Sequence, residues 1–284
     1  MKILITGVNG QVGHALMREL NDHELIGLTR QDCDLTNPDQ IKEVIDHYQP
    51  ELIINPAAYT KVDQAEDEPV LAFQINRDAP KVMAEKAREY NIPLIHFSTD
   101  YVFDGEKEGP YVETDQTHPL GVYGHSKYAG EEAIQEVGGQ IYIFRTSWVY
   151  SNIGNNFYLT MKRLSEERDK LNVVADQLGV PTSNKFVAEQ IKYLIPQLNQ
   201  NNNGIYHLVP DGSCFWYEFA KKIISQTNPE FNLENLYPIQ THEFPTKTKR
   251  PTNSMLSNVK IKQKFNLDLN DWEKCLSQVI SEEN

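Results

Sequence analysis

Tyr123 and Lys127 are the two residues of this sequence whose types and spacing point most directly to chemistry. They lie four positions apart, so on a helix the phenol and the ammonium stand side by side. A nearby cation favours the phenolate, and we expect Lys127 to lower the pKa of Tyr123 from its ordinary value of about 10. An acidified phenol serves general acid/base catalysis, and the pair therefore predicts a proton relay. A tyrosine beside a solvated lysine has the same spacing, so the pair needs support from other positions.

A glycine-rich turn near the start of the chain provides that support. Lys2–Thr6 is a short run of strand formers, and Gly7, Gly10 and Gly13 follow it and lead into a helical pattern. The first amides of a helix bind pyrophosphate at the positive end of the helix dipole. We expect Gly7 to permit the tight turn, Gly10 the close approach of a cofactor, and Gly13 the packing of helix on strand. The spacing is G-x-x-G-x-x-G rather than G-x-G-x-x-G, so its place between strand and helix carries the prediction.

The end of the second predicted strand, Glu24–Arg30, bears on the choice of cofactor. An acidic residue at this end binds the ribose hydroxyl of NAD, whereas an Arg accommodates the 2′-phosphate of NADP. The strand ends in Thr29 and Arg30, which predicts NADPH as the cofactor and leaves NADH as the alternative. Asp34 and Leu35 are expected near the adenine. Arg30 as a solvated charge and Asp34 as part of a helix-capping loop are the alternative interpretations.

Short apolar strands alternate with helical segments through the first half of the chain. The further predicted strands are Leu52–Asn55, Leu94–Thr99 and Ile141–Arg145, and Ala79–Tyr90 is an intervening helix. This alternation predicts an α/β fold with a doubly wound parallel sheet, Rossmann-like and covered by helices on both faces. Ligands of such sheets bind at the carboxyl ends of the strands, so polar residues just past those ends are site candidates.

Several motifs in one order resemble a known family. The glycine turn together with Tyr123 and Lys127 resembles the extended short-chain dehydrogenase/reductase superfamily, whose members mostly act on nucleotide sugars. Further segments are similar to its dTDP-4-dehydrorhamnose reductase family, namely Ser98–Gly105, Arg145–Tyr150, Asp176–Thr182 and Arg250–Leu256. The resemblance implies an NADPH-dependent oxidoreductase that converts dTDP-4-dehydro-β-L-rhamnose to dTDP-L-rhamnose, the last step of dTDP-L-rhamnose synthesis.

The resemblance also implies roles for single residues. Thr99 would hydrogen-bond the reacting carbonyl, Tyr123 would donate the proton, and Lys127 would hold the nicotinamide ribose. The other residues implied at the cofactor are Gly7, Gly10, Gln11, Val12, Gly13, Arg30, Asp34, Leu35, Ala57, Ala58, Tyr59 and Phe97. The residues implied at the substrate are Thr99, Asp100, Trp148 and, for the diphosphate, Arg250.

Three of the substrate candidates also have structural interpretations. Asp100 suits a hydrogen bond to backbone at a strand end, and Trp148 suits a partly buried packing position. Arg250 ends the basic cluster Lys247–Arg250, and such clusters are typical of solvated faces.

Composition favours a soluble cytoplasmic enzyme. The chain has 284 residues, 39% of them hydrophobic, and its 40 acidic against 27 basic residues give a formal net charge of −13. A broad basic face for nucleic acid is therefore not expected. No apolar stretch approaches the roughly 20 residues that span a bilayer. The 3 cysteines are scattered and the 8 histidines show no ligand pattern, which indicates reduced thiols and no metal site, although Mg²⁺ stays open.

We predict a division into two lobes. Residues 1–150 with about 172–204 form the dinucleotide-binding domain, and about 151–171 with 205–284 form a smaller substrate lobe. In that lobe Ile205–Leu208 is predicted as a strand and Trp216–Ile224 as an amphipathic helix. The expected partner is a nucleotide-sugar substrate, and a homodimer is the assembly that we consider.

Two rival functions stay open. The first is another nucleotide-sugar enzyme, a 4-epimerase or a 4,6-dehydratase. Dehydratases of the superfamily usually follow the Thr with Asp-Glu, and Tyr101 stands here in place of that Glu, which argues against dehydration but not against epimerisation. The second is a non-catalytic cofactor-binding subunit, because a regulatory subunit of methionine adenosyltransferase resembles the same family. The presence of Thr99, Tyr123 and Lys127 favours catalysis.

Overall fold

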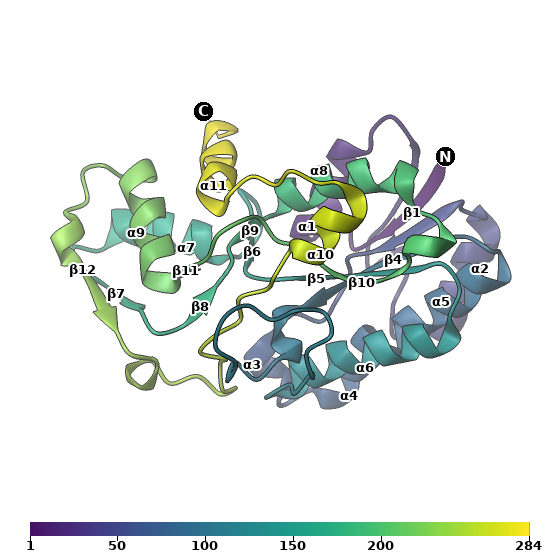
Figure 1. Ribbon diagram of the computed structural model, residues 1–284, viewed down its shortest axis with the longest axis horizontal. Helices are drawn as coiled ribbons and strands as arrows, with labels where there is room; N and C mark the ends of the chain where they lie inside the picture. The colour runs from purple at the N-terminus through teal and green to yellow at the C-terminus, as the bar shows by residue number, and fades with distance from the viewer. Residues whose placement is uncertain (284) are drawn as a thin grey trace.

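A six-stranded sheet forms the larger part of the protein in the computed structural model, which describes residues 1–283 (Figure 1). Its strand order is β10-β5-β4-β3-β1-β2, and all neighbours run parallel. The strands are β1 (Lys2–Thr6), β2 (Glu24–Leu28), β3 (Leu52–Asn55), β4 (Leu94–Thr99), β5 (Ile141–Thr146) and β10 (Gly204–His207). The strand order reverses between β1 and β3, which confirms the predicted doubly wound fold and places a crevice at that point.

Helices cover both faces of this sheet (Figure 1). One face carries α1 (Gln11–Glu19), α8 (Asn184–Leu194) and α10 (Val259–Phe265), and the other carries α2 (Pro38–Tyr48), α5 (Ala79–Glu89) and α6 (Val122–Val137). Successive side chains of a strand point to opposite faces. In β1, Ile3 and Ile5 therefore pack under α1 and α8, while Leu4 packs with the helices opposite.

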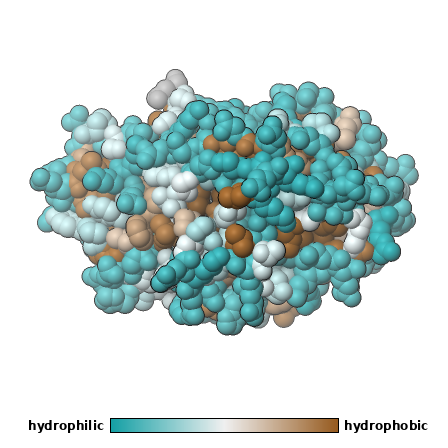
Figure 2. Space-filling view, in the orientation of Figure 1, coloured by the Kyte–Doolittle hydropathy of each residue, from teal (hydrophilic) through white to brown (hydrophobic). Residues whose placement is uncertain are grey.

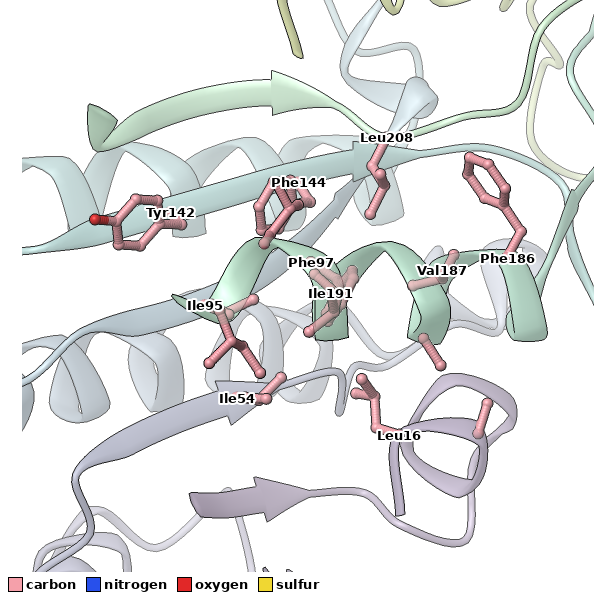
Figure 3. Close-up of a cluster of buried hydrophobic side chains, with 14 of the residues drawn as sticks. Leu16, Ile54, Ile95, Phe97, Tyr142, Phe144, Phe186, Val187, Ile191 and Leu208 are labelled. Carbon is pink, nitrogen blue, oxygen red and sulfur yellow. The ribbon is translucent and has the colours of Figure 1, made fainter. Parts of the chain in front are cut away.

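Large apolar side chains fill the space between the sheet and α8 (Figure 3). Phe97 of β4 and Phe144 of β5 lie with ring centroids 6.2 Å apart, facing Val187 and Ile191 of α8. Each such side chain contributes roughly 1.5–3 kcal/mol when it is fully buried. This packing fixes the position of β4 relative to α8. The carboxyl end of β4 carries Thr99, so the position of Thr99 is fixed as well.

Short helices follow β3 and lead into α5. They are α3 (Val62–Ala65), α4 (Pro69–Phe73) and a π-helical turn over Gln74–Asp78. The N-cap of α6, Gly121, offers no side chain to the helix, and instead the carboxylate of Glu66 accepts a 2.8 Å hydrogen bond from the Val122 N–H. A negative charge stabilises the N-terminus of a helix, so Glu66 ties this region to the start of α6.

A second, smaller part of the chain is built from short strand pairs and three helices. The pairs are β6 (Val149–Tyr150) with β9 (Thr182–Ser183), β8 (Leu178–Gly179) with β11 (Cys214–Phe215), and β7 (Leu171–Val174) with β12 (Leu236–Ile239). Its helices are α7 (Phe157–Glu167), α9 (Trp216–Thr227) and α11 (Trp272–Ser281), which pack around a core of their own. We call this part the substrate lobe, as in the prediction.

Several segments lie elsewhere than the sequence predicts. Residues 204–207 (β10) and 259–265 (α10) fall in the range predicted for the substrate lobe, but β10 pairs with β5 at the edge of the main sheet and α10 packs there as well. Strands β7, β8 and β9 fall in the range predicted for the dinucleotide-binding domain, but they pair with β12, β11 and β6 in the smaller part. A short strand can pair with any free strand edge that the tertiary structure places beside it. The residues of the strand do not determine which edge that is.

The face of the molecule in Figure 2 is mostly hydrophilic, with apolar residues in separate groups. Within residues 1–283, none of the helices combines the length and the apolar character that a membrane span requires.

Candidate active site

The glycine turn between β1 and α1 has the geometry that the spacing predicts. Gly7 has φ of +60°, which favours glycine, and its carbonyl accepts a 2.9 Å hydrogen bond from the Gly10 N–H. A Cβ at Gly13 would lie 2.3 Å from the Gly7 oxygen, so only a glycine lets α1 pack this closely. A Cβ at Gly10 would meet one atom, the Gly7 oxygen, at 3.2 Å. Gly13 is thus needed for packing, whereas a side chain at Gly10 would crowd only the Gly7 carbonyl oxygen.

This difference gives a paired prediction. We expect Gly13→Ala to destabilise the protein by about 2 kcal/mol or more, because backbone must move to admit the methyl group. Gly10→Ala is expected to leave the free energy of unfolding within about 0.5 kcal/mol and to weaken dinucleotide binding at least tenfold, roughly 1.4 kcal/mol. Urea unfolding and titration with NADP⁺ separate the two effects. Equal stability losses in both variants would contradict the assignment of Gly10 to the cofactor.

A pocket of about 440 Å³ opens beside the turn, at the carboxyl ends of β1, β2 and β3. The predicted cofactor residues that line it are Gly7, Arg30, Asp34, Leu35, Ala57, Ala58 and Tyr59. Asp34 also accepts hydrogen bonds from the backbone and side chain of Thr36, which lower the pKa of its carboxyl. Arg30 is exposed and forms no ion pair with any carboxylate of residues 1–283. The pocket has the position and the residues expected for the adenosine end of a dinucleotide.

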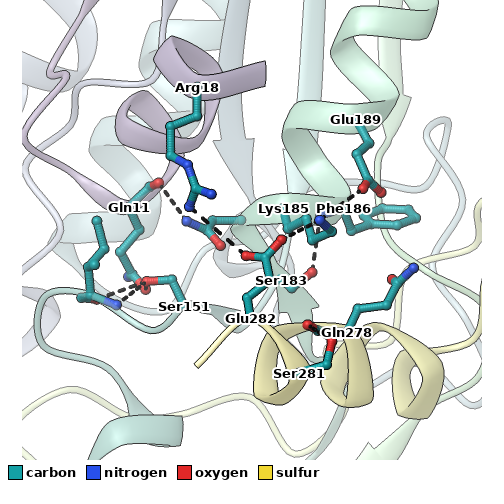
Figure 4. Close-up of polar contacts among 12 residues, drawn as sticks. Gln11, Arg18, Ser151, Ser183, Lys185, Phe186, Glu189, Gln278, Ser281 and Glu282 are labelled. Atoms are coloured by element: carbon teal, nitrogen blue, oxygen red, sulfur yellow. Dashed lines mark hydrogen bonds and ion pairs between the residues drawn. The ribbon is translucent and has the colours of Figure 1, made fainter. Parts of the chain in front are cut away.

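Three other predicted cofactor residues direct their side chains elsewhere. Phe97 packs in the core of the sheet, so only its carbonyl reaches the site, and Val12 packs against the same core. The side-chain oxygen of Gln11 accepts hydrogen bonds from Ser151 at 2.7 Å and Asn156 at 3.0 Å (Figure 4). Any contact of Gln11 with pyrophosphate therefore falls to its backbone amide at the start of α1. The side chain instead joins α1 to the loop before α7.

The predicted catalytic residues meet at the carboxyl end of β4. Thr99 ends that strand, and its hydroxyl lies close enough to the Tyr123 hydroxyl to lower the pKa of the phenol. Tyr123 and Lys127 lie one turn apart on α6, which packs along β4. The ring of Tyr101 contacts that of Tyr123 edge to face at a centroid distance of 5.6 Å and limits its movement. The structure thus brings Thr99 to the helix that carries Tyr123 and Lys127, more than 20 residues further along the chain.

The predicted acidification of the phenol is wrong for this structure. Burial raises the pKa of Tyr123 well above its usual value, and the Asp100 and Tyr101 side chains add to that effect against the lowering by Thr99. Burial also lowers the pKa of Lys127 to about 8, with Glu131 opposing the change. The reason is desolvation, which disfavours the charged form of either group and which a helical spacing does not report.

The ammonium of Lys127 points to β4. It donates a 2.7 Å hydrogen bond to the Phe97 carbonyl and lies 3.3 Å from His96 Nε2. His96 Nδ1 is 3.1 Å from Asn55 Nδ2, and Asn55 Oδ1 is 2.6 Å from the Thr6 hydroxyl. These three polar residues lie near the carboxyl ends of adjacent strands, and the sequence analysis does not single them out. In the sequence, the signal that could have identified them is that each is a polar residue in or at the end of a predicted apolar strand.

Glu131 and Arg145 form a buried ion pair behind Lys127. Two hydrogen bonds, of 2.9 and 2.6 Å, join the guanidinium to the carboxylate, and both side chains are at most 2% exposed. Glu131 is four residues beyond Lys127 on α6, so an acidic residue at helical spacing from the lysine was the signal.

The chain matches a family model described as RmlD substrate binding domain over residues 1–284. A dTDP-4-dehydrorhamnose reductase of Aggregatibacter actinomycetemcomitans is 41% identical, with 98% of each chain covered. One from Escherichia coli K12 is 40% identical, with 99% of this chain and 98% of that protein covered. The chain belongs to the dTDP-4-dehydrorhamnose reductase family. A crystal structure of such a reductase from Bacillus anthracis in complex with NADP superposes with a TM-score of 0.93, at 38% identity and 99% coverage of both chains.

Two of the predicted substrate residues come from different parts of the fold: Asp100 follows β4 of the main sheet, and Trp148 contacts the substrate lobe. Asp100 is 2% exposed, its Oδ1 accepts a 3.0 Å hydrogen bond from Thr99, and its Oδ2 has no partner within residues 1–283. Burial raises the pKa of Asp100 to about 6, against the effect of the Ser254 and Thr99 hydroxyls. Trp148, from the loop between β5 and β6, has φ of +46° and stacks on Trp216 of the substrate lobe with centroids 3.5 Å apart.

Arg250 is engaged inside the protein. Its guanidinium donates a 2.8 Å hydrogen bond to Asp63 of α3 and contacts the hydroxyl of Tyr101 at 3.3 Å. Arg250 therefore links the C-terminal half of the chain to the catalytic end of β4. The alternative interpretation of Arg250 as part of a solvated basic cluster is wrong for this residue. Lys247 pairs with Asp67 in the same segment.

The described part of the chain, residues 1–283, offers no group of side chains that could hold a metal ion. Among residues 1–283, no three or more His, Cys, Asp or Glu side chains are grouped to hold one. Nothing in the structure therefore supports the Mg²⁺ that the sequence leaves open.

Proposed function

We propose that this protein reduces the 4-keto group of dTDP-4-dehydro-β-L-rhamnose to give dTDP-L-rhamnose, with NADPH as the hydride donor. The observation that carries the proposal is that Thr99, Tyr123 and Lys127 lie at the carboxyl end of β4 and on α6, in a fold whose neighbouring strands form a pocket with the residues expected for the adenosine end of a dinucleotide, in a member of the reductase family. The relatives and the NADP complex support the substrate and the cofactor class.

The residues at the pocket fit a dinucleotide. Helix α1 has no side-chain cap at its N-terminus and no acidic residue in its first turn, so its free amides favour an anion. At Gly10 the absence of a side chain lets an anion approach the backbone. When bound, the cofactor supplies a hydride to the keto carbon.

The chain's own residues supply the proton and the geometry. Because its pKa is raised, Tyr123 is protonated at neutral pH and can donate its proton to the keto oxygen as the hydride arrives. Thr99, whose hydroxyl donates to Asp100 in this structure, would turn that hydrogen to the same keto oxygen when the substrate binds and would stabilise the developing negative charge. Lys127, one helical turn beyond Tyr123, holds its ammonium at the Phe97 carbonyl of β4. A protonated phenol suits reduction, whereas the reverse oxidation needs the phenolate.

The decisive experiment measures NADPH consumption with the dTDP-4-keto sugar and with its UDP and GDP counterparts. We expect one NADPH oxidised per sugar, with dTDP-L-rhamnose identified as product by NMR. Product formation without net NADPH consumption would indicate a 4-epimerase, and no turnover with any keto sugar despite tight NADPH binding would indicate a binding subunit. Either result would overturn the proposal.

Arg30 provides a test of the NADPH preference. The exposed guanidinium at the end of β2 is free to pair with a 2′-phosphate, and loss of one charge-assisted hydrogen bond costs about 1.5 kcal/mol or more. We expect Arg30→Ala to raise KM for NADPH about tenfold and to change KM for NADH less than twofold. Lys42→Ala, an exposed cation on α2, is the control. Parallel increases for both cofactors would contradict the role of Arg30.

We further propose that the protein works in the cytoplasm as a homodimer. Cys33, Cys214 and Cys275 are buried free thiols, which support a reducing compartment. Cell fractionation tests the location, and sedimentation equilibrium tests the dimer.

A further inference from the structure

Lys127 is a buried ammonium without a carboxylate partner. It is 2% exposed and forms no ion pair within residues 1–283. Two of its three donors have defined partners, the Phe97 carbonyl and His96 Nε2. A buried charge is tolerated when its hydrogen bonds are satisfied, so the character of His96 Nε2 decides how well Lys127 holds its proton.

His96 is itself closed off from solvent. It is 0% exposed in the middle of β4, and Asn55, its neighbour across the strand pair β3 and β4, is also 0% exposed. Asn55 in turn contacts Thr6, which is 2% exposed at the end of β1. Thr6 lines the cofactor pocket, so the row of side chains runs from that pocket to Lys127.

The row of side chains allows two arrangements of its hydrogen bonds, and the contacts in the structure, with Asn55 Nδ2 beside His96 Nδ1 and Thr6 donating to Asn55 Oδ1, are those of the second. With a charged Lys127, His96 Nε2 accepts, Nδ1–H donates to the Asn55 carbonyl, and the Asn55 amide donates to Thr6. With a neutral Lys127, Nε2–H donates to the lysine nitrogen, Nδ1 accepts from the Asn55 amide, and Thr6 donates to the Asn55 carbonyl. The imidazole is neutral in both. The arrangements differ by the histidine tautomer and by a rotation of one amide.

We propose that His96 is a positioning residue of the reduction, whose neutral imidazole accepts a hydrogen bond from the Lys127 ammonium in its Nδ1–H tautomer, with the Asn55 amide turned so that its oxygen accepts from Nδ1–H. This inference rests on the proposed function for its catalytic meaning. The hydrogen bond to His96 Nε2 keeps Lys127 charged. The third N–H of the Lys127 ammonium is left to face the cofactor side of the site. When Lys127 loses its proton, the tautomer changes and His96 gains no charge.

The electrostatic surroundings support a neutral imidazole. Burial and the Lys127 charge hold the pKa of His96 well below its usual range. The charged and titratable groups that act on Lys127 are Glu131 on its own helix and His96 on β4, and Arg145 on β5 is the ion-pair partner of Glu131. Arg145 is paired with Glu131, so His96 is the one titratable side chain of residues 1–283 that hydrogen-bonds the ammonium directly.

Two amide variants separate the two ring nitrogens. In His96→Gln the side-chain amide reaches the position of Nε2 and keeps an acceptor for Lys127, whereas in His96→Asn it reaches that of Nδ1 and keeps only the Asn55 contact. We expect His96→Asn to lower kcat about tenfold and to move the alkaline limb of the kcat–pH profile about one unit down, because the ammonium loses an acceptor. His96→Gln is expected within threefold of wild type, about 0.7 kcal/mol or less, with an unmoved limb. If both variants lost the same amount of kcat and had the same alkaline limb in the kcat–pH profile, the proposal would be overturned.

A readout without turnover keeps this test independent of the proposed function. Nitrogen-15 NMR of histidine-labelled protein distinguishes the tautomers, and the His96 signals are assigned as those lost in His96→Gln. We expect the Nδ1–H tautomer at pH 6 and the Nε2–H tautomer at pH 10, with no imidazolium at either pH. In Lys127→Met the tautomer is expected not to change with pH. A single tautomer throughout the wild-type titration, or a protonated imidazole, would refute the proposal even in a fully active reductase. Absence of turnover with the expected NMR transition would refute only the proposed function.

Discussion

Replacement of Tyr123 by Phe is expected to lower kcat about a thousandfold, because general acid catalysis by a positioned side chain contributes about 10²- to 10⁴-fold. The change removes one oxygen and keeps the ring that contacts Tyr101 edge to face. Binding of NADPH is therefore expected to stay within twofold of wild type. Single-turnover measurements with saturating NADPH check the first quantity, and a fluorescence titration checks the second.

Tyr128→Phe is the matched control, since Tyr128 lies on the same helix and packs in a different cluster. We expect its kcat to stay near that of wild type. A Tyr123→Phe enzyme that keeps more than about a tenth of wild-type kcat would remove the phenol from the mechanism, since that loss is only 1.36 kcal/mol of barrier. The binding-subunit alternative would then regain weight.

Loss of the Glu131 carboxylate has the largest expected effect on stability. Glu131→Ala leaves the guanidinium of Arg145 buried without its partner, and breaking a buried pair in this way costs about 3–5 kcal/mol. Arg145 Nη1 already has no hydrogen-bond partner within residues 1–283, so the protein offers no second acceptor at hand. The free energy of unfolding in urea measures the loss.

Two variants make that measurement specific. Glu132→Ala removes an exposed carboxylate at the next position and is expected to change stability by less than about 0.5 kcal/mol. Glu131→Leu combined with Arg145→Met replaces both charges and is expected to recover most of the stability, because no charge stays buried alone. A loss below about 1 kcal/mol for Glu131→Ala would mean that water reaches Arg145 and that the pair contributes little.

The N-terminal half of the fold was predictable because its signals are local. A strand, a turn with Gly7 at positive φ and a helix follow one another directly, and their hydrophobic periods identify them without long-range information. Strand β10 shows the limit. Its residues predict a strand, but its pairing with β5 depends on a contact between segments about 60 residues apart, for which the periodicity carries no signal.

The site shows the same division. Thr99, Tyr123 and Lys127 were identified by motif and resemblance, and the structure brings them together. The pKa of Tyr123 was predicted with the wrong sign, because the sequence shows the neighbouring charge but not the burial that outweighs it. The row of Thr6, Asn55 and His96 required the register of three strands, which no single segment encodes.

The return of β10 to the main sheet also limits how this protein can be cut. Truncation after residue 150 would remove β10 and α10 and leave β5 as an open edge, with the apolar face of Tyr142 and Phe144 uncovered. Unpaired apolar edges recruit other chains, so such a fragment would aggregate rather than bind nucleotide. Exchanging substrate specificity between relatives by recombination would likewise require transplanting several separate stretches at once, since the chain passes back and forth between its two parts.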